Sequence, residues 1–298
     1  MKKFAIITDS CSDLDKALRE EYDIDYVPMH FIINEKDYLA SLDWDEVSAP
    51  DFYNMMKDGT RILTSQVSMN DYREKFEKYI NEGYDILSIS CSSALSASVK
   101  ASYTVRDELQ AKYPEAKIIC IDSLIACIGL GMICIMASEL RAEGKSIDEV
   151  AEWIEENKLT INQEGAVDKL TYLKQAGRVS ATSAFFGGLL NIKPILISDK
   201  YGRNLAVEKV KGRRASIDRV VERLKERFVS TEKNRVFIGH ANCVEDAEII
   251  KEELIKTMPN EKLDVHIGYI GPIVGATVGP GMLGVYFVGK KVTEPEEE

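Results

Sequence analysis

Short hydroxyl side chains gather in two segments of the sequence, Thr64-Ser65-Gln66 and Ser92-Ser93. Hydroxyl groups can donate hydrogen bonds to an anionic oxygen without supplying a full charge. Serine and threonine also cap helices and form turns in many proteins, so the two segments alone leave a structural role open. Among the histidines, His240 has the best position for a site role because it ends a predicted strand.

Two glycine-containing motifs do not predict nucleotide binding. Residues 279–284 match GxGxxG, but residues 285–288 predict a strand where a dinucleotide fold needs a helix. Gly144-Lys145-Ser146 resembles the end of a P-loop, but Glu139 stands where that motif requires its first glycine. The six cysteines form no CxxC pair and share no metal-ligand spacing with the histidines. We therefore expect no metal, no cofactor, and reduced cysteines in the core.

Two other classes of protein remain open from the residues. One is a serine hydrolase or acyltransferase that acts through Ser93, assisted by His240, although the sequence has no GxSxG elbow to expose such a nucleophile. It would require a base within hydrogen-bond reach of Ser93. The other is a sugar- or nucleotide-binding protein, which would have a polar, solvated cleft.

Composition narrows the class of protein and its compartment. The 298 residues are 45% hydrophobic and 29% charged, which suits two domains with buried cores. A net charge of -11 disfavours general affinity for nucleic acid or anionic membranes. The most apolar stretch, residues 118–137, is interrupted by Asp122 and Ser123, and the first ten residues lack the features of a secretory signal. We expect a cytoplasmic protein without stable membrane insertion.

The elements needed to position the hydroxyl groups alternate as in an α/β fold. Strands are predicted at residues 4–8, 85–90 and 118–121, with helices from about Asp13 and Leu95 between them. Ligands in such folds gather beyond the carboxyl ends of parallel strands. Those ends carry Thr8-Asp9-Ser10, Ser90 to Ser93, and Asp122-Ser123. The pattern therefore predicts that three strand ends converge on hydroxyl groups.

The chain is predicted to contain two domains and a tail. Residues 1–158 form an N-terminal α/β domain with an inserted hairpin at residues 26–38, and Ser68 and Ser146 are predicted to cap helices. Residues 159–292 form a second α/β domain, because the pattern of predicted strands and helices changes after about residue 159. It is predicted to contain an apolar helix near 184–190, a hairpin turn at 199–202, and a helix from about Ser216. Residues 293–298 form an acidic tail that is predicted to fray.

The order and spacing of several segments resemble the DegV family, bacterial fatty-acid-binding proteins that serve as the acyl-presenting subunits of a two-component fatty acid kinase. The matching segments span nearly the whole chain. They are ITDSCSDL at 7–14, TSQ at 64–66, SSALSAS at 92–98, IDS at 121–123, LTYLKQAGRVS at 170–180, LLNIKPIL at 189–196 and IGPIVGATVGPGMLGVYF at 270–287.

The resemblance implies two α/β lobes with the lipid pocket between them. A long-chain fatty acid would be the ligand, and its carboxyl group would be held by hydroxyls at Thr64 and Ser93, with Ser65 and Thr277 nearby. The family often has His where Thr277 stands and Gly where Ala97 stands, and a threonine cannot carry the positive charge of a histidine.

The resemblance also implies that the chain itself is not an enzyme. A separate ATP-dependent fatty acid kinase would form the acyl phosphate. Arg178 and the basic run that includes Arg213 would face the kinase or the developing acyl phosphate, and Ser92 and His240 would lie near the pocket.

Overall fold

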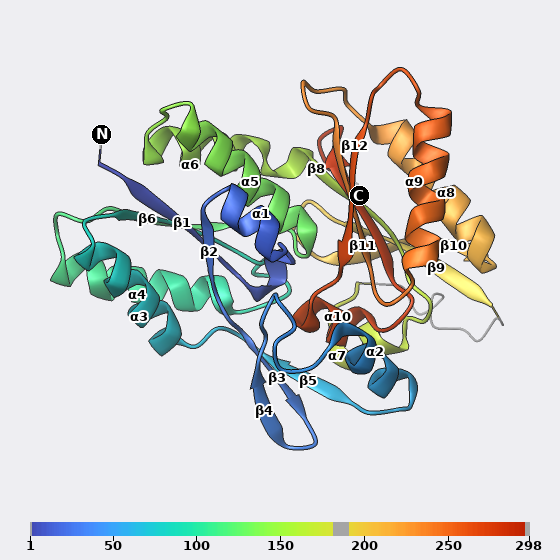
Figure 1. Cartoon of the computed structure of the whole chain (residues 1–298), viewed down its shortest axis with the longest axis horizontal. Helices are drawn as coiled ribbons and strands as arrows, with labels where there is room; N and C mark the ends of the chain where they lie inside the picture. The colour runs from blue at the N-terminus through green and yellow to red at the C-terminus, as the bar shows by residue number, and fades with distance from the viewer. Residues whose placement is uncertain (1, 181–190, 296–298) are drawn as a thin grey trace. The chain divides into compact units, whose positions relative to one another are not determined.

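The computed structural model describes residues 2–180 and 191–295, and the chain divides into two compact units (Figure 1). Unit 1 contains residues 1–46, 62–158 and 271–273, and unit 2 contains residues 47–61, 159–270 and 274–298. The predicted boundary after residue 158 would place residues 47–61 in the first domain and residues 271–273 in the second. In the structure, residues 47–61 belong to unit 2 and residues 271–273 belong to unit 1. Periodicity in the sequence shows which element a segment forms, but it does not show which neighbours the element packs against.

Unit 1 is built on a four-stranded parallel sheet in the order β2-β1-β6-β7. Its helices cover both faces: α3 and α4 pack together on one face, and α5 and α6 pack together on the other (Figure 1). The strands are β1 (Phe4–Asp9), β2 (Ile24–Val27), β6 (Asp85–Ser90) and β7 (Ile118–Asp122). The helices are η1 (Ser10–Ser12), α1 (Lys16–Glu21), α3 (Met69–Asn81), α4 (Ser98–Lys112), α5 (Ile128–Ala142) and α6 (Ile147–Asn157), and the short helix η2 (Lys158–Thr160) contains the chain boundary between the units.

A three-stranded antiparallel sheet, in the order β4-β3-β5, also belongs to unit 1. It consists of β3 (His30–Ile33), β4 (Lys36–Leu39) and β5 (Ile62–Ser65). The turn between β3 and β4 uses Asn34 and Glu35, which have φ values of 49° and 67°. Positive φ at both central residues is typical of the tight turns that match the twist of a hairpin.

Serine caps fix the starts of three helices. Ser68 accepts a hydrogen bond from the Asp71 amide at the start of α3, and Ser146 forms a complete capping box with Glu149 at the start of α6. Both caps were predicted from the sequence and are confirmed. The helix α2 (Ala49–Lys57) in unit 2 is capped by Ser48 in the same way. The helix predicted from about Asp13 instead begins at Lys16, because Asp13 adopts a left-handed conformation after η1.

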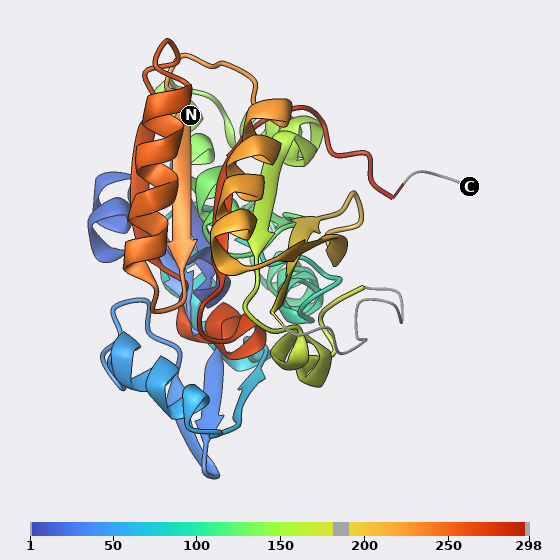
Figure 2. The ribbon, with the colours of Figure 1, turned by 90° about the vertical axis from the view of Figure 1, so that its right-hand side faces the viewer.

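Unit 2 is built on a six-stranded mixed sheet in the order β10-β9-β8-β13-β11-β12. The apolar sides of α8 and α9 pack on this sheet to form the core of the unit (Figure 2). The strands are β8 (Ile161–Ala166), β9 (Ile192–Ser198), β10 (Asn204–Lys211), β11 (Arg235–His240), β12 (Asp264–Tyr269) and β13 (Leu283–Val288). The remaining helices are α7 (Thr171–Ala176), α8 (Arg213–Arg227), α9 (Val244–Thr257) and α10 (Pro272–Val278).

The predicted elements of the described second half agree with these bounds, with one correction. The turn at residues 199–202 joins β9 and β10 as predicted, and β13 follows residues 279–282, so the GxGxxG match does not open a helix. Helix α8 begins at Arg213, three residues before the predicted start. The predicted apolar helix at 184–190 lies outside the described residues.

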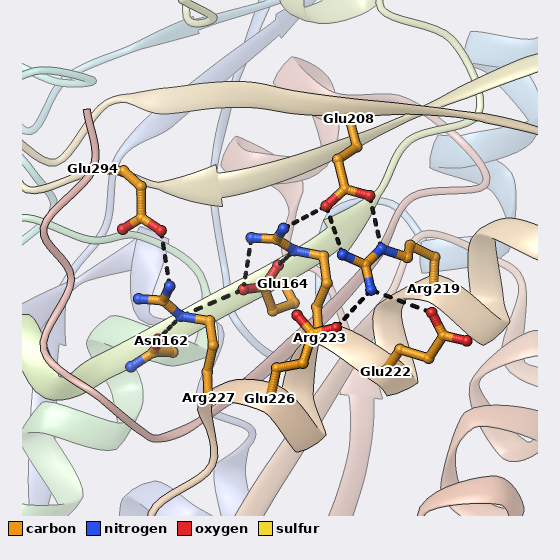
Figure 3. A network of polar contacts seen from close by, with 9 residues as sticks. All are labelled: Asn162, Glu164, Glu208, Arg219, Glu222, Arg223, Glu226, Arg227 and Glu294. Carbon is orange, nitrogen blue, oxygen red and sulfur yellow. Dashed lines mark hydrogen bonds and ion pairs between the residues drawn. The ribbon is translucent and has the colours of Figure 1, made fainter. Parts of the chain in front are cut away.

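A network of arginine and glutamate side chains joins α8 to the sheet of unit 2 (Figure 3). Glu164 of β8, whose side chain is 1% exposed, accepts hydrogen bonds from Arg223, which also binds Glu208 of β10. Arg227 binds Glu294 at 2.8 Å. Glu294 thus has a partner on α8, residues 296–298 lie outside the described part, and the fraying of the acidic tail stays a prediction.

Candidate functional site

The parallel sheet of unit 1 has a topological switch point between β1 and β6. From β1 the chain passes to β2 on one side, and β6 then pairs with β1 on the other side. Crevices for ligands form at such points beyond the carboxyl ends of the strands. The Asp9 carboxylate spans this point, because it accepts hydrogen bonds from the amides of Cys11 and Cys91, both at 2.9 Å.

A third strand end meets this point from β7. The Ser123 amide donates to the carbonyl oxygen of Ser90 at 3.2 Å, and the Ser93 amide donates to Asp122 Oδ1 at 3.1 Å. The backbone after β6 is thus held by both neighbouring strands. The prediction that three hydroxyl-bearing strand ends converge is confirmed.

The residue that follows the Thr64–Gln66 segment forms a hydrogen bond to the start of α4, close in the chain to the Ser92–Ser93 segment. The Val67 amide donates to Ser98 Oγ at 3.1 Å, and Ser98 begins α4, which follows the Ser92–Ser96 loop. The side chains of Thr64, Ser65 and Ser93 are exposed. The two hydroxyl segments singled out in the sequence therefore belong to one unit and are joined through Ser98.

Ser92 differs from its neighbour Ser93. Its side chain is buried, and its Oγ accepts a hydrogen bond from the Ala94 amide at 3.2 Å. A buried hydroxyl engaged in its own turn stabilises the loop. Ser92 therefore shapes the loop that presents Ser93.

Two buried carboxyl groups support this edge of the sheet. Burial raises the pKa of Asp9 to about 6, despite the two amides that donate to it. Burial also raises the pKa of Asp13 to about 7, and the nearby Cys127 thiol and Gly271 amide offset this shift only in part. Within the described residues, neither carboxylate oxygen of Asp13 has a hydrogen-bond partner of ordinary geometry. An ionised Asp13 is therefore poorly compensated.

We expect the stability of unit 1 to fall as the pH rises between about 4 and 7, as far as Asp13 contributes. Folding raises the pKa of Asp13 from 3.8 to about 7, so in this window the unfolded chain releases its proton before the folded chain does. Asp13→Asn should remove this penalty and stabilise the protein at pH 8 by on the order of 3 kcal/mol, with little gain at pH 4. Thermal unfolding at both pH values measures the difference.

Asp15→Asn is the matched control for that measurement. Asp15 caps α1 through the Leu18 amide, and asparagine caps helices equally well, so no gain at pH 8 is expected. An Asp13→Asn variant that is less stable than the parent at pH 8 would show that the ionised carboxyl is compensated in the folded state.

The other residues singled out in the sequence lie in unit 2. His240 ends β11, its side chain is buried, and its ring lies 4.3 Å from that of Tyr269. Burial lowers the pKa of His240, which favours the neutral imidazole. Its Nδ1 accepts a hydrogen bond from the Cys243 amide at 3.4 Å, and Arg213 reaches the Cys243 sulfur at 3.5 Å. The structure thus brings His240 and Arg213 to the same turn.

Arg178 and Thr277 lie in other segments of unit 2. Arg178 is exposed just after α7, and its carbonyl oxygen accepts a hydrogen bond from Asn204 Nδ2 at 3.0 Å. Thr277 lies on α10 and is half-buried. Its role in binding a carboxyl group stays a prediction.

Asp13 is the residue of this region that sequence reasoning missed. Its position after a Ser-Cys-Ser run gave no sign of burial, and its φ of 49° depends on the turn at η1. Helix α5 packs so closely on this turn that a Cβ at Gly131 would lie 2.7 Å from the Ser12 carbonyl oxygen. Among the described residues, no group of three acidic, histidine or cysteine side chains is placed to hold a metal ion.

The two units define an α/β protein in which hydroxyl groups line the carboxyl ends of a parallel sheet. The chain belongs to the DegV family, whose model, described as uncharacterised proteins, matches residues 3–290. A DegV domain-containing protein of Clostridium perfringens is 39% identical over 289 residues, which cover 97% of this chain and 98% of the relative. The predicted family is therefore confirmed.

Solved structures of the family share the fold. The DegV structure from Bacillus subtilis, described as a fatty acid binding protein, has a TM-score of 0.83 and 28% identity, covering 97% of this chain and all of its own. A DegV lipid binding protein from Thermotoga maritima has a TM-score of 0.81 and 26% identity, covering 98% of this chain and all of its own. The predicted α/β fold class is confirmed. In the part of the chain that the structure describes, no helix has the length and apolar character needed to cross a membrane.

Proposed function

We propose that this protein binds one long-chain fatty acid in a buried pocket, with the carboxyl group at the switch point of unit 1. The proposal rests on the exposed hydroxyls of Thr64 and Ser93, which lie on two segments of unit 1 joined by the hydrogen bond from Val67 to Ser98, in a chain of the DegV family. The related proteins from Bacillus subtilis and Thermotoga maritima, described as binding a fatty acid and a lipid, supply the class of ligand.

The acyl chain and the carboxyl group of such a ligand make unequal contributions to the free energy of binding. Burial of about fifteen methylenes stabilises the complex by on the order of 12 kcal/mol before the costs of ordering and desolvation. Each hydroxyl contributes roughly 0.5–1.5 kcal/mol net, because it replaces a hydrogen bond to water. The hydroxyls therefore orient the carboxyl group and avoid its unsatisfied burial, while the acyl chain provides most of the affinity.

Thr64→Ala combined with Ser93→Ala should weaken binding of a long-chain fatty acid about tenfold, since two donors to one carboxyl group are lost. Competition against a fluorescent fatty acid measures the change. Thr104→Ala is the matched control, because Thr104 is exposed on α4 and its Oγ1 donates to the Lys100 carbonyl oxygen. Equal affinities for the double variant and the control would place the carboxyl group elsewhere.

The finer part of the proposal is presentation of the carboxyl group to a separate ATP-dependent kinase, which would form the acyl phosphate. Arg178 is exposed after α7 and is proposed as part of the surface for that partner. The two matches to nucleotide-binding motifs in this sequence are incomplete, so we assign binding of the phosphoryl donor to the partner.

We expect the purified chain, loaded with fatty acid, to consume no ATP above a heat-inactivated control. Phosphate release measured without any other protein tests this expectation. Sustained release that depends on fatty acid would show that the chain is itself a kinase. A serine-directed phosphonate distinguishes the alternative of a hydrolase, because a covalent adduct at Ser93 requires an activated nucleophile.

A further inference from the structure

Ser96 is a serine of unit 1 that is linked to both hydroxyl segments of the proposed carboxyl site. Its amide donates to the carbonyl oxygen of Ser92 at 3.0 Å, which folds the loop between them into a turn. Its Oγ lies 2.9 Å from Ser98 Oγ, which accepts a hydrogen bond from the amide of Val67, just after the other segment. The side chain of Ser96 is half-buried, so part of it remains accessible to a ligand.

The direction of the hydrogen bond between Ser96 and Ser98 follows from the surroundings of Ser98. The Val67 amide can only donate, so Ser98 Oγ is its acceptor. The Ser98 side chain is fully buried, and among the described residues Ser96 Oγ is the one acceptor that its hydroxyl hydrogen meets. Buried polar groups are nearly always satisfied in native proteins. Ser98 therefore donates to Ser96.

The hydroxyl group of Ser96 is left as a donor. Its Oγ accepts the Ser98 hydroxyl and also the Ser98 amide, which lies at 3.2 Å. A hydroxyl oxygen has two acceptor positions and one hydrogen, so both acceptor positions are filled. The hydrogen of Ser96 has no acceptor within the part of the chain that the structure describes. A series of bonds that runs from Val67 through Ser98 to Ser96 also polarises the last hydroxyl, which strengthens it as a donor.

A structural role explains only part of this arrangement. A serine that accepts the amide two residues later forms a common turn at the start of a helix, and Ser96 forms such a turn before α4. That turn requires one acceptor position of Ser96 Oγ and places no demand on its hydrogen. The second position is filled by the buried Ser98 hydroxyl, and this bond directs the hydrogen of Ser96 away from the turn.

The neighbouring groups leave a carboxylate dependent on hydroxyl donors. The Ser93 amide donates to Asp122 Oδ1 at 3.1 Å, so it is not available to a ligand. Asp122 also accepts the Leu124 amide at 3.1 Å, and these two amides compensate part of its charge. The first turn of α4 contains no acidic residue that would repel a ligand carboxylate. A hydroxyl at Ser96 can therefore supply a hydrogen bond that the Ser93 amide cannot.

We propose that Ser96 donates a further hydrogen bond to the carboxyl group of the fatty acid and that Ser98 is the positioning residue that orients the Ser96 hydroxyl. The inference rests on the proposed function and adds a third donor to Thr64 and Ser93. Because hydrogen bonds to an ionised acceptor are about twice as strong as those between neutral groups, Ser96 favours the carboxylate over a neutral ester of the same acyl chain.

Affinities for a long-chain fatty acid and for its methyl ester, measured by competition against a fluorescent fatty acid, test the role of Ser96. Ser96→Ala should raise the Kd of the acid about fivefold and that of the ester at most about twofold. Ser96→Thr keeps the hydroxyl and should stay within about twofold of the parent for both ligands. An unchanged Kd for the acid in Ser96→Ala would overturn the proposal, as would an equal rise for acid and ester, which indicates a general change in the pocket.

Ser98→Ala tests the positioning role, with Ser102→Ala as the matched control. Both serines are buried on α4, but Ser102 Oγ donates to the Val99 carbonyl oxygen at 2.8 Å. Ser98→Ala should raise the Kd of the acid severalfold and more than that of the ester, Ser98→Thr should restore it, and Ser102→Ala should change neither. Equal affinities of Ser98→Ala and Ser102→Ala for the acid would overturn the proposal even if Ser96→Ala fails to fold.

The parent protein separates failure of this inference from failure of the proposed function. A parent that binds neither the acid nor the ester would refute both. A parent that binds the acid, with an equal Kd in Ser96→Ala, would refute the inference alone and leave the carboxyl group with Thr64 and Ser93.

Discussion

Replacing Arg223 with methionine should destabilise the protein by about 3 kcal/mol, the largest loss of stability that we expect from a single substitution. Arg223 is the main partner of Glu164, whose side chain is 1% exposed and lies in the middle of the network in Figure 3. Removing one member of a buried ion pair leaves an uncompensated charge, which typically costs ~3–5 kcal/mol. Arg227 lies 3.8 Å from Glu164 and still compensates part of its charge in the variant. The expected loss of stability is therefore at the lower end of that range.

Urea denaturation followed by circular dichroism measures this change, with Arg214→Met as the control. Arg214 lies on the same helix with a side chain that is 57% exposed, and its loss should change the stability by less than about 1 kcal/mol. Glu164→Met/Arg223→Met should be more stable than Arg223→Met alone, because no buried charge then remains unpaired. Additive losses in the double variant would show that the two side chains are not coupled.

The second large effect concerns the length of the ligand and rests on the proposed function. Shortening a saturated fatty acid from about sixteen to about twelve carbons should weaken binding on the order of 100-fold, because each buried methylene contributes ~0.8 kcal/mol. The loss of both carboxyl-binding hydroxyls should cost only about tenfold. Chain length, rather than the polar contacts, should therefore dominate affinity.

A series of acids of graded length, competed against one fluorescent fatty acid, gives these affinities. The methyl ester of the longest acid is the matched control, because it keeps the acyl chain and loses the ionised carboxyl group. Affinities that stay within a few-fold across the series, with a large loss for the ester, would reverse the assignment and make the carboxyl group the main determinant.

The sequence predicted much of the fold because its local signals agreed with tertiary packing. Ser68 and Ser146 precede amphipathic runs with an acidic residue three positions later, and both serines cap helices. The predicted strands end in polar residues because the parallel sheet stops at the switch point, where Asp9 joins the ends of β1 and β6. These features depend on residues that are close in the chain or on neighbouring strands.

The remaining features depend on contacts between distant residues. Burial of Asp13 arises from packing against Cys127 and Gly271, which no local pattern reveals. A cavity in unit 2 is lined by both Lys57 of α2 and Arg213 of α8, which are far apart in the sequence. Arg213 lies within a basic run of the sequence, and because the helix was predicted to start at about Ser216, Arg213 was expected in a loop. The uncapped start of α8 became visible only with the structure.

Native mass spectrometry of the purified protein, followed by organic extraction and identification of any bound molecule, tests the central claim most directly. The account predicts one long-chain fatty acid per chain, held noncovalently and exchangeable for added fatty acid. A chain that neither retains nor takes up any fatty acid would contradict the account and favour the hydrolase or a polar ligand.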